Sequence, residues 1–477
     1  MRHRVSRAAL VLDCGATNVR AIAVSADGQT LATRSVPNAP SPDPGLPGGK
    51  IWDHERIWRD FSSCARAVVA EVGAERMGAL TVTTFGVDGA LVDQHGTPLY
   101  PMIAWPCGRT TAMVAEVEDV VPGLYQRCGL QPFAFNTIYK LAWLARHRPE
   151  VLDRARAWLF ISNLFVHRMT GVMATDVTMA GTSMLTDGKT RRFSPETCGA
   201  LGLDAALFPP LVEPGTVVGN LRDQAAADLG LPPGLPVVSA GHDTQFALFG
   251  SGANEDEPVL SSGTWDILML RSRRLQPTEI LRSHGVTLEL DVEPGLLDPG
   301  AIWIASGLVE WLRRLAFGEL AGAAAYAAMI AEGSAAAPGS GGLRFSGDVL
   351  ANQAALAGLG LETSRGQLAR ALFEHLAGKT RAALHLLEQA GGFRAAALLC
   401  VGGGSKNRLW NQIRADVLGR PLRLVEQQET TVLGAACFAL PATGAFRDAR
   451  EARAAANLSS VVLEPGPDAG LYAGYQP

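Results

Sequence analysis

The chain carries the same short pattern twice, once in each half of its 477 residues. Residues 11–17 read VLDCGAT and residues 259–265 read VLSSGTW. Each copy is typical of a buried strand that enters a tight turn of small and hydroxyl residues, and a second strand-like run follows at 20–24 and at 267–270. One strand–turn–strand unit alone would be ordinary hairpin chemistry. The recurrence favours a shared function for the two turns.

The tips of such hairpins expose backbone N–H groups and threonine hydroxyls, which suit phosphate oxygens. Two tips, one in each half, would hold a polyphosphate from both sides of a cleft. A P-loop is excluded as the phosphate site, because no Gly-x-x-x-x-Gly-Lys-Ser/Thr string occurs. The glycine run at 402–404 separates a strand-like run from a helical one, where backbone can approach a flat or anionic ligand. The alternative for this run is tight packing without a ligand.

Strand-like and helix-like segments alternate along the chain, which indicates an α/β protein, and the length predicts two or three domains. The polar stretch 250–254 is the expected crossing between the halves. Residues 320–342, rich in Ala, Gly and Ser, are expected to form a mobile surface loop or a loosely packed helix. The pattern predicts strands at 80–85, 90–92, 236–240 and 396–401, and helices at 138–146, 154–170 (ended by Gly171), 364–390 (begun by Ser364) and 409–418.

The composition excludes several classes of protein. Charged residues make up 18% and hydrophobic residues 47%, the net charge is −4, and no basic cluster tracks a nucleic-acid backbone. The apolar run 8–12 is too short for a signal peptide, and the small-apolar stretch 321–331 is too short to span a bilayer. Seven scattered cysteines without a Cys-x-x-Cys pair indicate reduced thiols. We therefore expect a cytoplasmic protein without nucleic-acid or membrane partners.

Three acids, Asp13, Asp88 and Asp243, follow strand-like segments. Carboxylates at strand ends of α/β proteins point into the crevice rather than the core, so the three would serve a metal, a base and a sugar hydroxyl. Two alternatives remain open: Asp88 as a turn residue beside a glycine, and Asp243 as the N-cap of a helix.

These residues resemble the FGGY family of carbohydrate kinases in order and spacing. The resemblance is dense over about 9–315 and 395–440, and thin over 316–394 and in the C-terminal tail. Within the family, the chain is similar to kinases that act on L-fuculose. The matching strings are DCGATNVR at 13–20, TTFGVDGA at 83–90, FNT at 135–137, SAGHDTQFALFG at 239–250, EPVLSSGTW at 257–265 and GGG at 402–404.

The resemblance implies two actin-like (ribonuclease-H-type) domains flanking an inter-domain cleft. Domain 1–252 would carry the sugar site, the phosphate hairpin and the catalytic acid, and domain 253–477 would bind ATP. The expected activity is the ATP- and Mg²⁺-dependent phosphorylation of L-fuculose at its C1 hydroxyl, giving L-fuculose 1-phosphate. The alternatives are a kinase for L-rhamnulose or D-ribulose, or a non-catalytic sugar or nucleotide sensor on the same fold. The oligomeric state is left open, with a homodimer among the alternatives.

The resemblance also implies residue roles. Asp243 would be the general base and Asp13 a magnesium-associated acid. Phe133 and Phe135 are expected to pack on the methyl group of the sugar. Where many relatives have an acid, this chain has Cys107, so Arg109 is kept as a sugar contact and Cys107 is not. The expected ATP-binding residues are Asp13, Ala16, Thr17, Asn18, Arg20, Thr264, Gly403, Gly404 and Asn407, and the expected sugar-binding residues are Gly86, Asp88, Arg109, His242 and Thr244.

Overall fold

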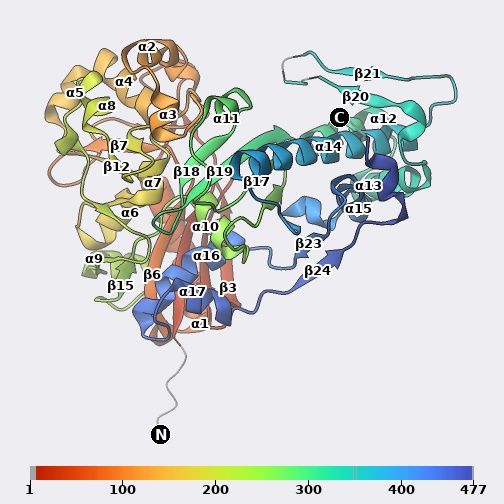
Figure 1. The fold of residues 1–477 in the computed structure, drawn as a ribbon. Helices are drawn as coiled ribbons and strands as arrows, with labels where there is room; N and C mark the ends of the chain where they lie inside the picture. The colour runs from red at the N-terminus through yellow and green to blue at the C-terminus, as the bar shows by residue number, and fades with distance from the viewer. Residues whose placement is uncertain (1–6, 348, 351, 475–477) are drawn as a thin grey trace, which may run out of the picture. The chain divides into compact units, whose positions relative to one another are not determined.

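The computed structural model describes residues 7–347, 349, 350 and 352–474 (Figure 1). The chain divides into two compact units. Unit 1 comprises Met1–Gly252, Gln276–Asp298 and Glu429–Asn457, and unit 2 comprises Ala253–Leu275, Pro299–Gln428 and Leu458–Pro477. Two segments from the second half of the sequence therefore fold with unit 1. The division of ligand roles between 1–252 and 253–477 stays a prediction.

Unit 1 is built on a six-stranded mixed sheet in the order β14-β15-β6-β1-β2-β3. Strands β1, β2 and β3 form an antiparallel meander, while β1, β6 and β15 run parallel. Every residue of β1 and β6 is buried, as expected for central strands covered on both faces. The strands are β1 (Ala8–Cys14), β2 (Asn18–Val24), β3 (Thr30–Pro37), β6 (Met77–Thr84), β14 (Val217–Asn220) and β15 (Pro236–Val238).

Unit 2 repeats these pairings in six strands of a seven-stranded sheet, in the order β19-β17-β16-β22-β23-β24. Strands β16, β17 and β19 are antiparallel neighbours, while β16, β22 and β23 run parallel. The predicted α/β class is confirmed, and each predicted hairpin lies at the same place in its sheet. The strands are β16 (Val259–Ser262), β17 (Trp265–Met269), β19 (Leu297–Ile304), β22 (Leu398–Val401), β23 (Leu422–Val425) and β24 (Ser460–Leu463).

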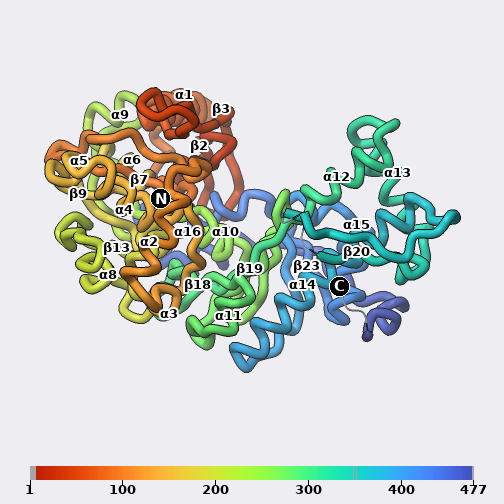
Figure 2. Tube along the Cα trace, turned by 90° about the horizontal axis from the view of Figure 1, so that it is seen from above, coloured from red at the N-terminus to blue at the C-terminus, as the bar shows by residue number. Residues whose placement is uncertain are grey.

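Helix α10 (Asp243–Gly250) lies against helix α16 (Thr430–Ala439), far away in sequence (Figure 1, Figure 2). Glycines make the close crossing: a Cβ added to Gly434 would lie 1.9 Å from the carbonyl oxygen of Phe246, and one added to Gly250 would lie 2.0 Å from that of Thr430. Helix α16 also packs on β1 and β6. The start of α10 is thereby fixed relative to the ends of these strands.

Most of the predicted helices are confirmed. Helices α4 (Thr137–His147), α14 (Arg365–Gly391) and α15 (Arg408–Leu418) cover the expected stretches, and Ser364 forms a capping box with Gln367. Of the two alternatives for 320–342, the structure shows a helix, α13 (Gly322–Ala335). Within the described residues, no helix combines the length and apolarity that a membrane crossing requires.

The predicted helix 154–170 is wrong in its first part. Residues Ala157–Phe160 form strand β9, which pairs with β7 (Gly89–Val92), and helix α6 begins only at Ile161. A short, fully apolar run has no periodicity that separates a buried strand from a buried helix. Gly171 ends α6 in the left-handed conformation, as predicted.

Candidate active site

The three parallel strands of unit 1 end at one edge of the sheet. The backbone N–H of Phe85, just after β6, donates to the carbonyl of Cys14 at the end of β1 (3.2 Å), and that of Thr84 donates to the carbonyl of Gly241 after β15 (3.0 Å). The end of β1, the turn after β6 and the start of α10 are therefore neighbours. This edge is where open α/β sheets bind their ligands.

Asp13 faces Arg20 across the first hairpin and is almost fully buried. Arg20 donates from Nε to Oδ2 of Asp13 (2.8 Å) and from Nη1 to Oε2 of Glu429 (2.7 Å). Burial raises the pKa of Asp13 to about 6; the Arg20 charge opposes this shift, and the nearby Asp243 adds to it. Arg20 is thus held between two acids, one of them brought in by the segment that precedes α16.

The tip of the first hairpin is held open by Asn38. The backbone N–H of Asn38 donates to the carbonyl of Thr17 (2.7 Å), and its Nδ2 donates to the carbonyl of Gly15 (2.9 Å). Thr17 and Asn18 are exposed, and Ala16 is half-buried. Of the residues that the sequence assigned to phosphate binding, Thr17 and Asn18 therefore face solvent, while an asparagine that sequence reasoning missed shapes their turn.

Asp243 is the first residue of α10, and the N-cap residue before it is His242, whose side chain makes no capping bond. The alternative of Asp243 as the N-cap is therefore wrong. The side chain of Asp243 is 29% exposed and accepts a hydrogen bond from Oγ1 of Thr244 (3.1 Å). Burial raises the pKa of Asp243, and the charge of His242 opposes the shift. A carboxylate that is not used as a cap and keeps an open side suits a proton acceptor.

His242 lies between two carboxylates. Its Nδ1 is 3.1 Å from Oε2 of Glu289, and its Nε2 is 3.4 Å from Oδ1 of Asp243. Glu289 comes from strand β18 (Thr287–Leu290), in a segment that folds with unit 1. Sequence reasoning missed Glu289, because an acid at an alternating position of a short strand indicates only a solvent-facing side chain.

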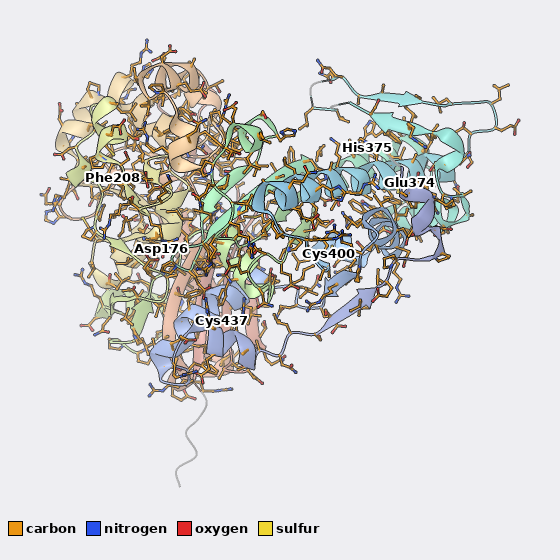
Figure 3. All side chains as sticks on the ribbon, in the orientation of Figure 1. Asp176, Phe208, Glu374, His375, Cys400 and Cys437 are labelled. Carbon is orange, nitrogen blue, oxygen red and sulfur yellow. The ribbon has the colours of Figure 1, made fainter. Side chains whose placement is uncertain are left out.

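The loop that carries His242 and Asp243 rests on a buried acid, Asp176 (Figure 3). Oγ of Ser239 donates to Oδ2 of Asp176 (2.6 Å), and Oγ1 of Thr178 accepts from the backbone N–H of His242 (2.9 Å). A Cβ on Gly241 would lie 2.4 Å from Oδ1 of Asp176, so only glycine fits between them. The sequence contained no signal that pointed to Asp176.

The turn after β6 packs directly on His242. A Cβ on Gly86 would lie 2.9 Å from Cδ2 of His242, which requires glycine here. Val87 has a positive φ of 64°, an unfavourable conformation for a β-branched residue. Its N–H donates to Oγ1 of Thr182 (2.9 Å), and its carbonyl accepts from Nζ of Lys140 (3.0 Å). Strain of this kind, held by surrounding bonds, is typical of functional turns.

Asp88 is completely buried. Its Oδ2 accepts from Nε1 of Trp52 (2.6 Å) and from the backbone N–H of Trp105 (2.9 Å), and its Oδ1 accepts from the buried Lys140. Burial raises the pKa of Asp88 and lowers that of Lys140, and their mutual attraction opposes both shifts. The carboxylate has no exposed surface, and its hydrogen bonds support the turn and Trp105, while its contact with the sugar stays a prediction. Sequence reasoning missed Lys140, because in the sequence it is only a single cation on an apolar helix face.

Arg109 is enclosed in the same way, with its side chain 3% exposed. It donates from Nη2 to Oδ2 of Asp43 (2.6 Å) and from Nε to Sγ of Cys107 (3.1 Å). These bonds brace the loop behind Trp105 and leave the guanidinium little surface for a sugar.

Three aromatic rings form a cluster beside Asp88: Trp105, Phe133 and Phe135. Phe133 stacks on Phe135 with ring centres 5.1 Å apart, and Trp105 meets Phe135 edge-on at 6.1 Å. Trp105 and Phe133 are 37% and 39% exposed. This aromatic cluster offers an apolar surface to solvent next to the polar strand ends.

In unit 2, the predicted residues fall on two turns. Thr264 is exposed in the turn between β16 and β17. Gly403 is exposed with no atom within 4 Å of an added Cβ, whereas a Cβ on Gly404 would lie 2.0 Å from Oγ of Ser262. Asn407 caps α15 by accepting from the backbone N–H of Trp410 (3.1 Å). Tight packing, the alternative explanation for the glycine run at 402–404, therefore accounts for Gly404. Gly403 leaves room for a ligand.

The residues fit a magnesium ion carried on substrate phosphates. Among the residues that the structure describes, no three or more His, Cys, Asp or Glu side chains gather into a metal-holding group. Mg²⁺ typically takes one or two protein carboxylates and completes its shell with phosphate oxygens and water. The carboxylate of Asp13, in β1, supplies hard oxygen donors of this kind.

The comparisons with known proteins agree with this geometry. The model of the FGGY family of carbohydrate kinases, N-terminal domain, matches residues 8–250, and that of the C-terminal domain matches residues 259–443. The chain is 47% identical to an L-fuculokinase of Escherichia coli (strain K12), covering 93% of this chain and 94% of that protein. It is 40% identical to an L-fuculokinase of Haemophilus influenzae, covering 94% and 97%. The crystal structure of a xylulose kinase from Rhodospirillum rubrum matches with a TM-score of 0.88 and 25% identity, covering 98% and 96%. The chain belongs to the FGGY family of carbohydrate kinases.

Proposed function

We propose that this protein transfers a phosphoryl group from ATP to the C1 hydroxyl of L-fuculose. The observation that carries the proposal is the position of Asp243, which lies at the ligand-binding edge of the sheet with an open, non-capping carboxylate. The L-fuculose preference is supported by 40–47% identity to L-fuculokinases over more than nine-tenths of the chain.

In the proposed mechanism, Asp243 accepts the proton of the reacting hydroxyl. Phosphoryl transfer needs in-line positioning and neutralisation of charge rather than covalent help from the protein. Arg20 and the tip at 16–18 would supply cationic and hydrogen-bonding groups to the phosphates. Mg²⁺, when bound to those phosphates, neutralises their charge, and Asp13 would hold it. In unit 2, Thr264 would contact phosphate, and Gly403, Gly404 and Asn407 would border the adenosine.

On the sugar side, we propose that Gly86, His242 and Thr244 face the ketose. Asp88 and Arg109 would contribute to the sugar site by holding in place the loops that they contact. The aromatic cluster would pack on the apolar terminal carbon of a 6-deoxy sugar. We also propose a cytoplasmic location, which is supported by seven cysteines that are all free and buried. A homodimer stays a proposal without a contact that supports it.

A ketose panel tests the substrate. ADP release is measured with ATP and Mg²⁺ on L-fuculose, L-rhamnulose and D-ribulose. We expect kcat/KM to be highest for L-fuculose. A higher value for another ketose would replace the substrate within the same enzyme class, and ATP turnover that no ketose stimulates would favour a non-catalytic sensor.

A further inference from the structure

A carboxylate, an imidazole and a second carboxylate form a row at the candidate active site. Oε2 of Glu289 is 3.1 Å from Nδ1 of His242, whose Nε2 is 3.4 Å from Oδ1 of Asp243. The side chains of Glu289 and His242 are only 16% and 14% exposed, whereas that of Asp243 is 29% exposed. The row therefore runs from a covered acid to the open acid that is the proposed base.

Glu289 is placed for this contact by its neighbours. Its Oε2 also accepts from Nε2 of Gln245, in the first turn of α10. A single oxygen atom therefore joins β18 to both the residue before the helix and the first turn of the helix. Strand β18 packs on helix α7 (Val177–Gly181), which contains Thr178, the residue that accepts from the backbone N–H of His242. Contacts to the ring and to the backbone N–H therefore both fix the orientation of His242.

The charges in this row favour an imidazolium. The charged groups facing His242 are Glu289 from β18 and Asp243 from α10. Burial lowers the pKa of His242, but the two carboxylates together raise it by more than burial lowers it. The net shift of this pKa is therefore upward. Burial raises the pKa of Glu289, and the attraction of His242 outweighs it, so that the net shift is downward.

We propose that Glu289 is a positioning residue for the phosphoryl transfer: it holds the His242 ring by Nδ1 and keeps it cationic, so that the neighbouring Asp243 stays ionised as the proton acceptor. This inference rests on the proposed function of Asp243. Burial would otherwise drive Asp243 towards its protonated, inactive form, and the charge of Glu289 adds to this effect by less than the charge of His242 opposes it. A cation within 4 Å favours the ionised form and offsets that effect.

The pH dependence of turnover tests the proposal. Glu289→Gln keeps the shape and an acceptor oxygen but removes the charge. We expect the acidic limb of the kcat profile to move to higher pH by about one unit or more, as for loss of a nearby opposite charge, with the KM for ATP within about twofold of wild type. Glu279→Gln is the matched control: this exposed acid of the same segment pairs with Arg282 and does not contact His242. It should leave the profile unchanged.

A purely structural role for Glu289 predicts a different outcome, namely a lower melting temperature and a kcat reduced equally at every pH. That result would overturn the proposal, as would an unchanged profile. A second measurement needs no turnover: the NMR titration of ¹³C-labelled His242, identified by its loss in His242→Asn, should show a lower midpoint in Glu289→Gln than in wild type. An unchanged midpoint would also overturn it. If wild type lacks kinase activity but the midpoint shifts, the proposed function fails while the link from Glu289 to His242 stands.

Discussion

Nη2 of Arg414 donates to Oδ2 of Asp266 at 2.7 Å, and neither side chain has any exposed surface. This pair joins α15 to β17 beneath the glycine turn of unit 2. Arg414 also donates from Nη1 to Oδ1 of Asn411 (3.0 Å), and Asn411 donates from Nδ2 to the carbonyls of Gly404 (3.2 Å) and Ser405 (2.9 Å). Because a broken buried ion pair leaves an uncompensated charge, the network gives this turn one rigid form.

The two neighbouring glycines of this turn should respond differently to alanine. Gly404→Ala places a Cβ against Ser262 and should lower the free energy of unfolding by about 1–3 kcal/mol. Gly403→Ala meets no atom within 4 Å and should leave stability unchanged, while a methyl group on the exposed turn should raise the KM for ATP. Denaturant unfolding and ATP kinetics of both variants check this. A Gly403→Ala protein with normal ATP kinetics would argue against adenosine bordering the turn.

Asp243→Asn should remove the proton acceptor and keep the fold. General-base catalysis contributes about 10²–10⁴-fold, so kcat should fall by at least 10²-fold, while ATP binding and the melting temperature stay near wild type. The stability expectation follows because the N-cap position of α10 is occupied by His242 and not by Asp243.

Asp223→Asn is the matched control for this variant. Asp223 is also the first residue of a helix in unit 1, α9 (Asp223–Leu229), and it also follows an N-cap residue, Arg222, whose side chain makes no capping bond. It should keep normal turnover. A folded Asp243→Asn enzyme with near-normal kcat would contradict the mechanism.

The aromatic cluster should set the preference for a 6-deoxy sugar. Phe135 contacts both Trp105 and Phe133, so Phe135→Ala opens the whole apolar surface. One apolar carbon in such a site is worth about 10–200-fold in discrimination. We expect the ratio of kcat/KM for L-fuculose to that for its 6-hydroxylated analogue to fall by about tenfold.

Phe193→Ala removes a half-buried ring of a separate stacked pair with Phe208 and controls for general loosening. It should leave the ratio as in wild type. If Phe135→Ala also leaves it unchanged, the methyl group of the sugar binds elsewhere.

His375 should make unit 2 sensitive to acid. This residue on α14 (Figure 3) is 6% exposed, and its Nδ1 has no hydrogen-bond partner among the described residues. Burial lowers its pKa from 6.5 to about 4, and Lys379 adds to the shift. Between these values the unfolded chain binds a proton that the folded protein does not, so stability falls as the pH falls from 6.5 to 4. The loss amounts to about 3 kcal/mol in all.

His375→Met should remove this part of the acid sensitivity. Denaturant unfolding of both proteins at pH 7 and pH 4.5 measures it, and the variant should lose less free energy of unfolding over the interval. Equal losses in the two proteins would show that His375 titrates normally in the folded state.

Much of the architecture was predictable because it is local. The recurrence of residues 11–17 at 259–265 predicted two hairpins, and both form at matching places in two sheets. Ser364 and the apolar spacing after it predicted α14 almost to the residue. The strand at 157–160 was missed because its pairing with β7, which is distant in sequence, decides its conformation.

The same distinction between local and long-range interactions applies to the candidate active site. The sequence by itself determined the family, the two turns and the acid at the start of α10, since glycines, hydroxyls and strand ends follow short-range rules. Only the tertiary structure decided which of these groups are open and which are enclosed. Lys140 closes off Asp88, Asn411 braces Gly404, and Glu289 reaches His242 from a segment that lies in the second half of the chain and folds with unit 1. Buried charges must find partners wherever the fold places them, and that requirement leaves no local pattern in the sequence.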